Sequence, residues 1–146
     1  KAQCGKGVSK QAFYLLPKIR EAEALLRSPS SDGLDWLETH PELCFSSFNG
    51  AVPMEDNKKT ESGFRERKSV LARHIPARTI DRLLRSLMAS LPRSQCARDD
   101  MVDALVCGVL ARLDATGRGC LPPGKRDFDE VGLPMRICYP IPTAFQ

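Results

Sequence analysis

The segment Asp99-Asp100-Met101-Val102-Asp103 opens the longest apolar-periodic stretch of the chain, which runs to about residue 114. Apolar and small residues recur in this stretch at helical spacing, which predicts a helix with one face available for burial. Asp100 and Asp103 are three residues apart, so we expect them to share a helix face, with Asp99 pointing elsewhere. Two carboxylates on one face at a helix start are a way to hold a divalent metal ion. The apolar face would consist of Met101, Ala104, Leu105, Gly108, Val109 and Leu113.

The same carboxylates also have a simpler interpretation. Acidic side chains in a first helical turn are favoured by the helix dipole, and aspartate is a good N-cap. Asp99 or Asp100 would then cap the helix, and the remaining acids would only match the dipole. Spacing alone does not separate this alternative from a metal site.

A second acidic cluster, Glu38-Thr39-His40-Pro41-Glu42, follows the short apolar run Leu34-Asp35-Trp36-Leu37. We predict a buried strand over 34–38 that ends at Glu38, and a helix that begins at Pro41. If this strand end lies beside the helix start at Asp100 and Asp103, three oxygen donors meet there. Such a set suits magnesium or manganese.

The neighbours of these acids are open to two interpretations each. His40 is either a metal ligand or base, or a capping or packing residue before the helix. Glu42 is either an outer group of the metal site or a dipole-matched acid. Lys58, Lys59 and Arg67 lie around a loop and the next helix start, where they would contact phosphate or form a solvated basic surface.

The rest of the chain predicts more helix than strand. Trp36, Phe45 and Phe48 are expected in the core, and Pro17 is expected to kink or split the first helix. Two strands do not form an independently stable sheet. Either they decorate a helical domain, or residues outside this chain complete the sheet. The predicted helices are 9–27, 41–48, 61–74, 79–91 and 99–114, the predicted strands are 34–38 and 135–139, and 118–132 is predicted as loop.

Bulk composition fits one domain of ordinary globular type. The chain has 146 residues, of which 42% are hydrophobic and 27% charged, with a formal net charge of +4. The mild positive charge is compatible with nucleic acid but does not identify a partner. The six cysteines form no C-x-x-C pair, which favours reduced thiols and a cytoplasmic protein. No signal peptide is recognisable, and no apolar run reaches the roughly 20 residues that span a membrane.

Six short motifs, in this order, resemble one known family. The chain is similar to the predicted RNase H-like nucleases grouped as domain-of-unknown-function family 429, and the resemblance covers nearly the whole length. The motifs are Gly7-Val8-Ser9-Lys10-Gln11-Ala12; Pro17-Lys18-Ile19; Glu38-Thr39-His40-Pro41-Glu42-Leu43-Cys44-Phe45; Lys58-Lys59-Thr60 with Gly63 and Arg67; Asp99-Asp100-Met101-Val102-Asp103-Ala104; and Asp129-Glu130-Val131-Gly132-Leu133-Pro134-Met135-Arg136-Ile137.

The resemblance implies an α/β fold, with a mixed RNase H-like sheet flanked by helices over a single domain, 1–146. It also implies a metal-dependent nuclease site with Glu38, Asp100 and Asp103 as ligands. Such sites also use an aspartate on the first strand, which this chain does not offer. We therefore expect that the N-terminal strands are missing and that the chain is about the C-terminal two-thirds of the domain.

The expected activity is hydrolysis of nucleic acid by a metal-activated water, with Mg or Mn as cofactor. One alternative is a non-catalytic nucleic-acid-binding or regulatory domain with a degenerate site. Another is a helical interaction protein whose acids are only caps. Apolar surface left by the missing strands would also favour a homodimer.

Overall fold

The computed structural model describes residues 7–92, 94–124 and 127–142, and Gln11 only in its backbone. Its contacts divide the chain into two compact units, Lys1–Trp36 and Leu37–Gln146. The single domain over 1–146 stays a prediction. Each unit is described by itself.

The first unit contains helix α1, Lys10–Leu26, followed by a 3-10 turn, Pro29–Ser31. Ser9 begins the helix as predicted, because its side chain accepts a hydrogen bond from the Ala12 N–H at 3.2 Å. The helix continues through Pro17 as one element. Its apolar side chains are largely exposed, with Phe13 at 62% and Ile19 at 56%.

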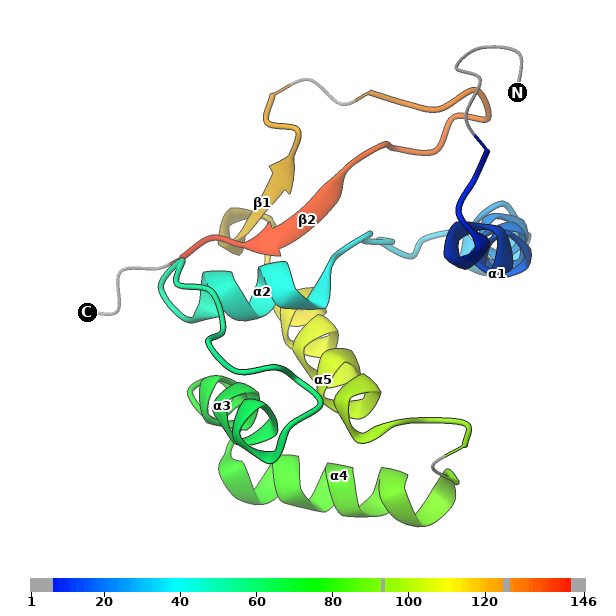
Figure 1. Cartoon of the computed structure of the whole chain (residues 1–146). Helices are drawn as coiled ribbons and strands as arrows, with labels where there is room; N and C mark the ends of the chain where they lie inside the picture. Colours follow the sequence, from blue (N-terminus) through cyan, green and yellow to red (C-terminus); the bar gives the residue numbers. More distant parts are fainter. Residues whose placement is uncertain (1–6, 93, 125–126, 143–146) are drawn as a thin grey trace. The chain divides into compact units, whose positions relative to one another are not determined.

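The second unit holds four α-helices among its described residues. They are α2 (Pro41–Phe48), α3 (Glu61–Leu71), α4 (Ala77–Ser90) and α5 (Arg98–Arg112). Helix α5 contacts each of the other three, so it is the central element of the unit (Figure 1). The core around it includes Phe45, Leu71, Ile80, Val106 and Leu110.

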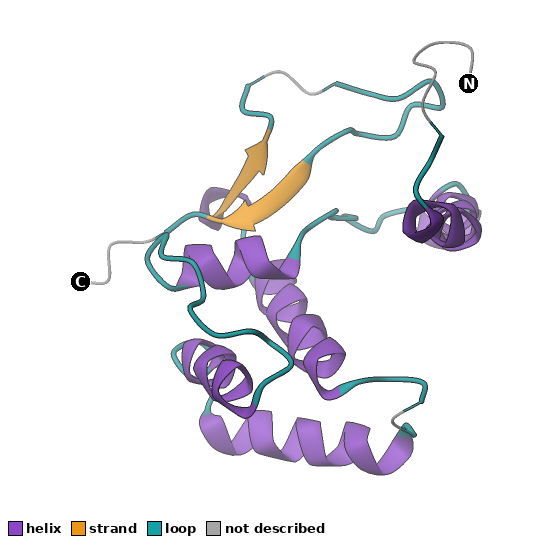
Figure 2. Ribbon diagram, viewed as in Figure 1, coloured by secondary structure: helices purple, strands orange, loops and turns teal. Residues whose placement is uncertain are grey.

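Two short strands, β1 (Arg118–Leu121) and β2 (Ile137–Pro140), pair antiparallel with Cys120 opposite Cys138. They pack on α2 through β2 (Figure 2). On its other edge, β2 makes a single parallel bridge from Cys138 to Thr39. Strand β2 therefore has an antiparallel neighbour on one side and a parallel contact on the other.

The predicted buried strand over 34–38 is wrong. Only Thr39, one residue beyond it, pairs with β2, while Leu34 and Trp36 are 59% and 43% exposed. Of the apolar side chains in this segment, Leu37 packs against the core and is partly buried, whereas the other two are exposed. Trp36 is thus not a core residue, whereas the prediction that Phe45 and Phe48 are buried is confirmed.

The predicted loop over 118–132 contains a strand that sequence reasoning missed. Gly119 lies in β1 opposite Tyr139. A Cβ atom at Gly119 would lie 2.6 Å from the Tyr139 ring, so the glycine makes room for that ring. The predicted helices at 41–48, 61–74, 79–91 and 99–114 are confirmed, with ends that shift by up to three residues.

Gly63 lies against the backbone of Asn57 and leaves no room for a side chain. A Cβ atom there would lie 2.1 Å from the Asn57 carbonyl oxygen, a rigid backbone neighbour. We expect Gly63→Ala to lower the free energy of unfolding by about 2–3 kcal/mol. The matched control is Gly108→Ala on α5, where no atom lies within 4 Å. This change should raise the free energy of unfolding by about 0.5–1 kcal/mol. Urea denaturation of both variants checks the pair, and equal effects would contradict the packing.

Candidate functional site

The three aspartates at the start of α5 have two different roles. The Asp100 carboxylate accepts a hydrogen bond from the Ala97 N–H at 3.0 Å, which satisfies one of the unpaired donors at the helix start. Asp100 is exposed, while Met101 and Val102 are buried in the core. The N-cap is Ala97, and not Asp99 or Asp100 as the simpler interpretation predicted. Asp100 stabilises the helix start from the third helical position instead.

Asp99 and Asp103, four residues apart, lie on the face that meets Lys58. The Lys58 Nζ atom is 2.7 Å from Asp103 Oδ2 and 3.9 Å from Asp99 Oδ2. Both carboxylates are mostly buried, at 15% and 14% side-chain exposure. The pair that faces inward is thus Asp99 and Asp103, and not the predicted Asp100 and Asp103. We call Lys58, Asp99 and Asp103 the acid–lysine cluster.

A tight turn before α3 presents Lys58 to α5. The Asn57 side chain accepts from the Lys59 N–H at 3.0 Å, and the Asn57 carbonyl accepts from the Thr60 N–H at 2.9 Å. Thr60 then caps α3 through the Gly63 N–H. The hydrogen bond to Asp103 raises the pKa of the Lys58 ammonium above its ordinary value. Lys59, the next residue, is exposed.

One oxygen of the acid–lysine cluster has no partner. Asp103 Oδ1 is buried and accepts no hydrogen bond from any described residue. A buried polar atom without a partner is costly and is uncommon in folded proteins. This oxygen is therefore the point in the cluster that is best suited to receive a cation or a water.

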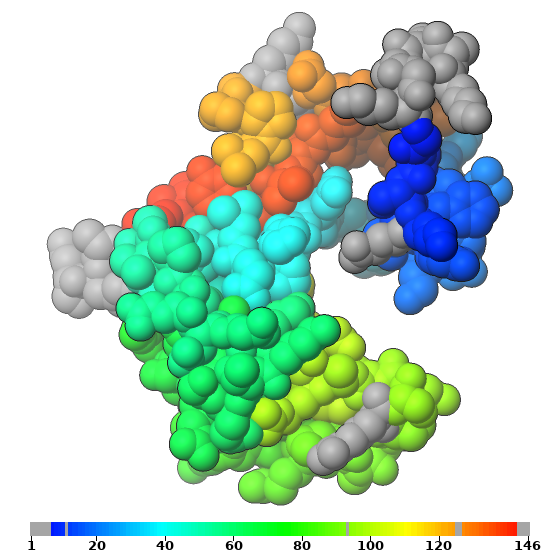
Figure 3. Space-filling model, viewed as in Figure 1, coloured from blue at the N-terminus to red at the C-terminus, as the bar shows by residue number. Residues whose placement is uncertain are grey.

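Arg67, predicted to contact phosphate, is instead a buried structural residue. It is 4% exposed, and its Nε and Nη2 atoms donate to the Glu42 carboxylate at 2.9–3.1 Å. Its Nη1 atom donates to the carbonyls of Asp56 and Gly63, both at 3.0 Å. The guanidinium thus joins α2, α3 and the preceding turn, which form one continuous surface (Figure 3). Every guanidinium nitrogen is engaged, so this geometry leaves no free donor for phosphate.

The other predicted site residues lie outside the acid–lysine cluster. Glu38 is exposed, and its backbone carbonyl accepts from the Cys138 N–H at 2.7 Å. His40 is exposed and precedes α2 without a side-chain cap. Across the described residues, no group of three His, Cys, Asp or Glu side chains is arranged to hold a metal. Metal binding by Glu38 with Asp100 and Asp103 therefore stays a prediction.

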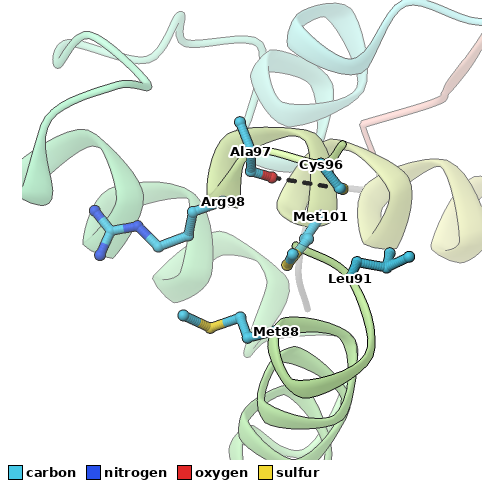
Figure 4. A pocket seen from close by; sticks show the side chains of 6 residues that line it. All are labelled: Met88, Leu91, Cys96, Ala97, Arg98 and Met101. Atoms are coloured by element: carbon cyan, nitrogen blue, oxygen red, sulfur yellow. Dashed lines mark hydrogen bonds between the residues drawn. The ribbon is translucent and has the colours of Figure 1, made fainter. Parts of the chain in front are cut away.

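A separate apolar pocket lies between the end of α4 and the start of α5 (Figure 4). The Arg98 side chain points away from Met101 there, donates to Glu61 at 2.7 Å and stacks on the Phe64 ring at 4.0 Å. None of the pocket residues is acidic, so the pocket is not part of the acid–lysine cluster. It is lined by Met88, Leu91, Cys96, Ala97, Arg98 and Met101.

The chain belongs to the family described as "Protein of unknown function (DUF429)", whose model matches residues 1–127. The family named by the sequence motifs is thus confirmed, although its description assigns no activity. No curated protein and no solved structure matches the chain. Among the described helices, none is long and apolar enough to cross a membrane.

The buried guanidinium predicts a large difference between two neighbouring arginines. We expect Arg67→Met to lower the free energy of unfolding by about 3 kcal/mol, because it leaves Glu42 and two carbonyls without their donors. Arg65→Met is the matched control on the same helix, since Arg65 is 75% exposed and should cost under about 0.5 kcal/mol. Thermal and urea unfolding measure both changes. A fully stable Arg67→Met variant would show that this contact does not hold the fold.

Proposed function

We propose that the chain is an RNase H-like, metal-dependent nuclease and that the acid–lysine cluster is its metal site. The observation that carries the proposal is the buried, unpartnered Asp103 Oδ1 beside a second buried carboxylate, Asp99. The resemblance of the sequence to predicted nucleases supports it. The mixed pairing around β2, with an antiparallel and a parallel neighbour, also supports an RNase H-like sheet.

Asp99 and Asp103 supply part of the ligand set that magnesium or manganese needs. Magnesium commonly binds through one or two carboxylates, several waters and the phosphate of a substrate. Asp99 and Asp103 supply that number of protein ligands, and Asp103 Oδ1 is available. When bound, the ion would activate water and stabilise the leaving oxygen in phosphodiester hydrolysis.

The residues of the cluster would then have separate tasks. Asp99 and Asp103 would hold the ion. Lys58, which now pairs with Asp103, would transfer its hydrogen bonds to a substrate phosphate when a cation replaces it. The exposed Lys59 on the same turn would contact the next phosphate.

A basic face on α4 supports nucleic acid as the partner. Arg78, Arg82 and Arg85 are exposed and recur at helical spacing, so they share one face of the helix. The opposite face carries the buried Ile80 and Leu84. Within the described part of the chain, none of the three arginines forms a salt bridge within 4 Å. They are thus available to phosphate groups.

The second candidate function is a non-catalytic nucleic-acid-binding module. The ion pair of Lys58 with Asp103 favours it, because the ammonium already neutralises the carboxylates that a metal would need. In this alternative, the lysine is a built-in substitute for the cation. Binding would then rest on Lys and Arg side chains and would persist in chelator, with a steep salt dependence.

Manganese calorimetry separates the assignments residue by residue. We expect Mn²⁺ to bind the chain. In Asp99→Asn/Asp103→Asn, the affinity for Mn²⁺ should fall by more than the roughly 10–100-fold that is lost when a group that only hydrogen-bonds to a metal ligand is changed. Asp100→Asn, the matched control, should keep the affinity, since Asp100 stabilises the helix start instead. Lys58→Met should bind more tightly, because the competing ammonium is gone.

Hydrolysis of DNA and RNA oligonucleotides, with Mn²⁺ and with chelator, tests the activity itself. Cleavage that requires Mn²⁺ and is lost in Asp99→Asn/Asp103→Asn is the expected result. Oligonucleotide binding in chelator without cleavage would favour the binding module. Loss of Mn²⁺ binding only in Asp100→Asn would contradict the assignment of the cluster.

A further inference from the structure

Cys120 and Cys138 lie directly opposite each other on the two strands of the sheet. Their Sγ atoms are 3.1 Å apart. All five described cysteines are free, so these two are thiols in contact. Neither residue belongs to the acid–lysine cluster, and the proposed nuclease chemistry does not use them.

The backbone around Cys138 favours a bond between the two sulfurs. The Cys138 N–H donates to the Glu38 carbonyl at 2.7 Å, and its own carbonyl accepts from the Thr39 hydroxyl at 2.7 Å. Both polar groups therefore face away from β1, which makes Cys120 and Cys138 a non-hydrogen-bonded pair. In such pairs the Cα atoms are about 4.5 Å apart and the side chains are at their closest. This separation lies within the roughly 4.4–6.8 Å that disulfides span.

The two thiols differ in access. Cys120 lines an open pocket at the end of the sheet, together with Pro122, Met135 and Tyr139. Cys138 is 1% exposed. Burial, with a contribution from the Cys120 thiol, raises the pKa of Cys138 to about 11. A reagent in solution therefore reaches Cys120 first, and Cys138 can only act on a sulfur that is already beside it.

We propose that Cys120 and Cys138 are a reversible modification site, which closes to a disulfide by exchange with a small disulfide such as oxidised glutathione. The Cys120 thiolate attacks one glutathione sulfur, and one glutathione leaves as its thiolate. Cys138 then loses its proton and attacks the Cys120 sulfur of the mixed disulfide, releasing the second glutathione. Two protein thiols are oxidised, and one oxidised glutathione is reduced to two thiols.

Closure would act on more than the two strands. Cys138 is also the residue whose backbone holds Glu38 and Thr39 to the edge of β2. Thr39 in turn contacts the Cys44 thiol of α2 at 3.0 Å. The disulfide would thus link β1 covalently to β2, the strand that binds Glu38 and Thr39. It would thereby stabilise the sheet.

Incubation of the whole chain with oxidised glutathione, followed by alkylation, trypsin and mass spectrometry, tests the proposal. Trypsin separates the two cysteines into the peptides 119–125 and 137–146. We expect these peptides to be joined, with no glutathione retained, and we expect closure to be faster at higher pH because Cys138 must lose its proton. Dithiothreitol should reverse the link.

Two variants and a stability readout complete the test. Cys96→Ser should close normally, since Cys96 lies just before α5 and lines the other pocket, whereas Cys120→Ser should not close. Oxidation should raise the Tm by roughly 5–10 °C in the parent chain and in Cys96→Ser only. Circular dichroism establishes that each variant is folded. Three results would overturn the proposal: glutathione retained on Cys120, a link between other cysteines, or no reaction.

Discussion

The arrangement of the second unit depends on one buried cation. Arg67 places all of its guanidinium nitrogens on Glu42 and on the carbonyls of Asp56 and Gly63. Arg67 is 4% exposed, and its guanidinium carbon lies 5.8 Å from the centre of the Phe45 ring. Water therefore solvates this charge very little. A buried charge is tolerated only when it is paired and hydrogen-bonded. The contact therefore fixes α2, α3 and the turn between them as one body.

The acid–lysine cluster follows from that constraint. The turn that Arg67 holds through Asp56 also carries Lys58, and the Asn57–Thr60 hydrogen bonds aim it at α5. Helix α5 contributes Asp99 and Asp103 from one face while it buries Met101 and Val106 on another. The cluster thus combines the long, flexible side chain of Lys58 with two carboxylates on a rigid helix. In the proposed function, the Lys58 ammonium would give way to a metal ion and would then bind a substrate phosphate.

The sequence predicted helices better than strands, for a physical reason. Apolar spacing and caps such as Ser9 are local signals, and these helices were found near their observed bounds. Strand β1 was missed because its pairing with β2 is set by residues about twenty positions away. The role of Gly119, which makes room for the Tyr139 ring, depends on that pairing. Trp36 was placed in the core on its hydrophobicity, yet it is 43% exposed.

The candidate site was predicted in part. Sequence spacing located the acids at the start of α5, but it could not tell which carboxylate the Ala97 N–H would engage. The i to i+4 spacing of Asp99 and Asp103 was the available signal for the inward pair. Burial of Arg67 was not visible, because its partners come from α2, from the turn before α3 and from α3 itself. Partners that lie so far apart in the sequence can be identified only from the structure.

Paramagnetic broadening of backbone amide signals by Mn²⁺, followed by two-dimensional NMR on the labelled chain, tests the central assignment most directly. The effect falls steeply with distance from the ion, so it reports which residues surround it. We expect substoichiometric Mn²⁺ to broaden the signals of Lys58 and of residues 99–103 first. Broadening centred on residues 38–42, or spread evenly over exposed acids, would contradict the assignment of Asp99 and Asp103 as the metal site.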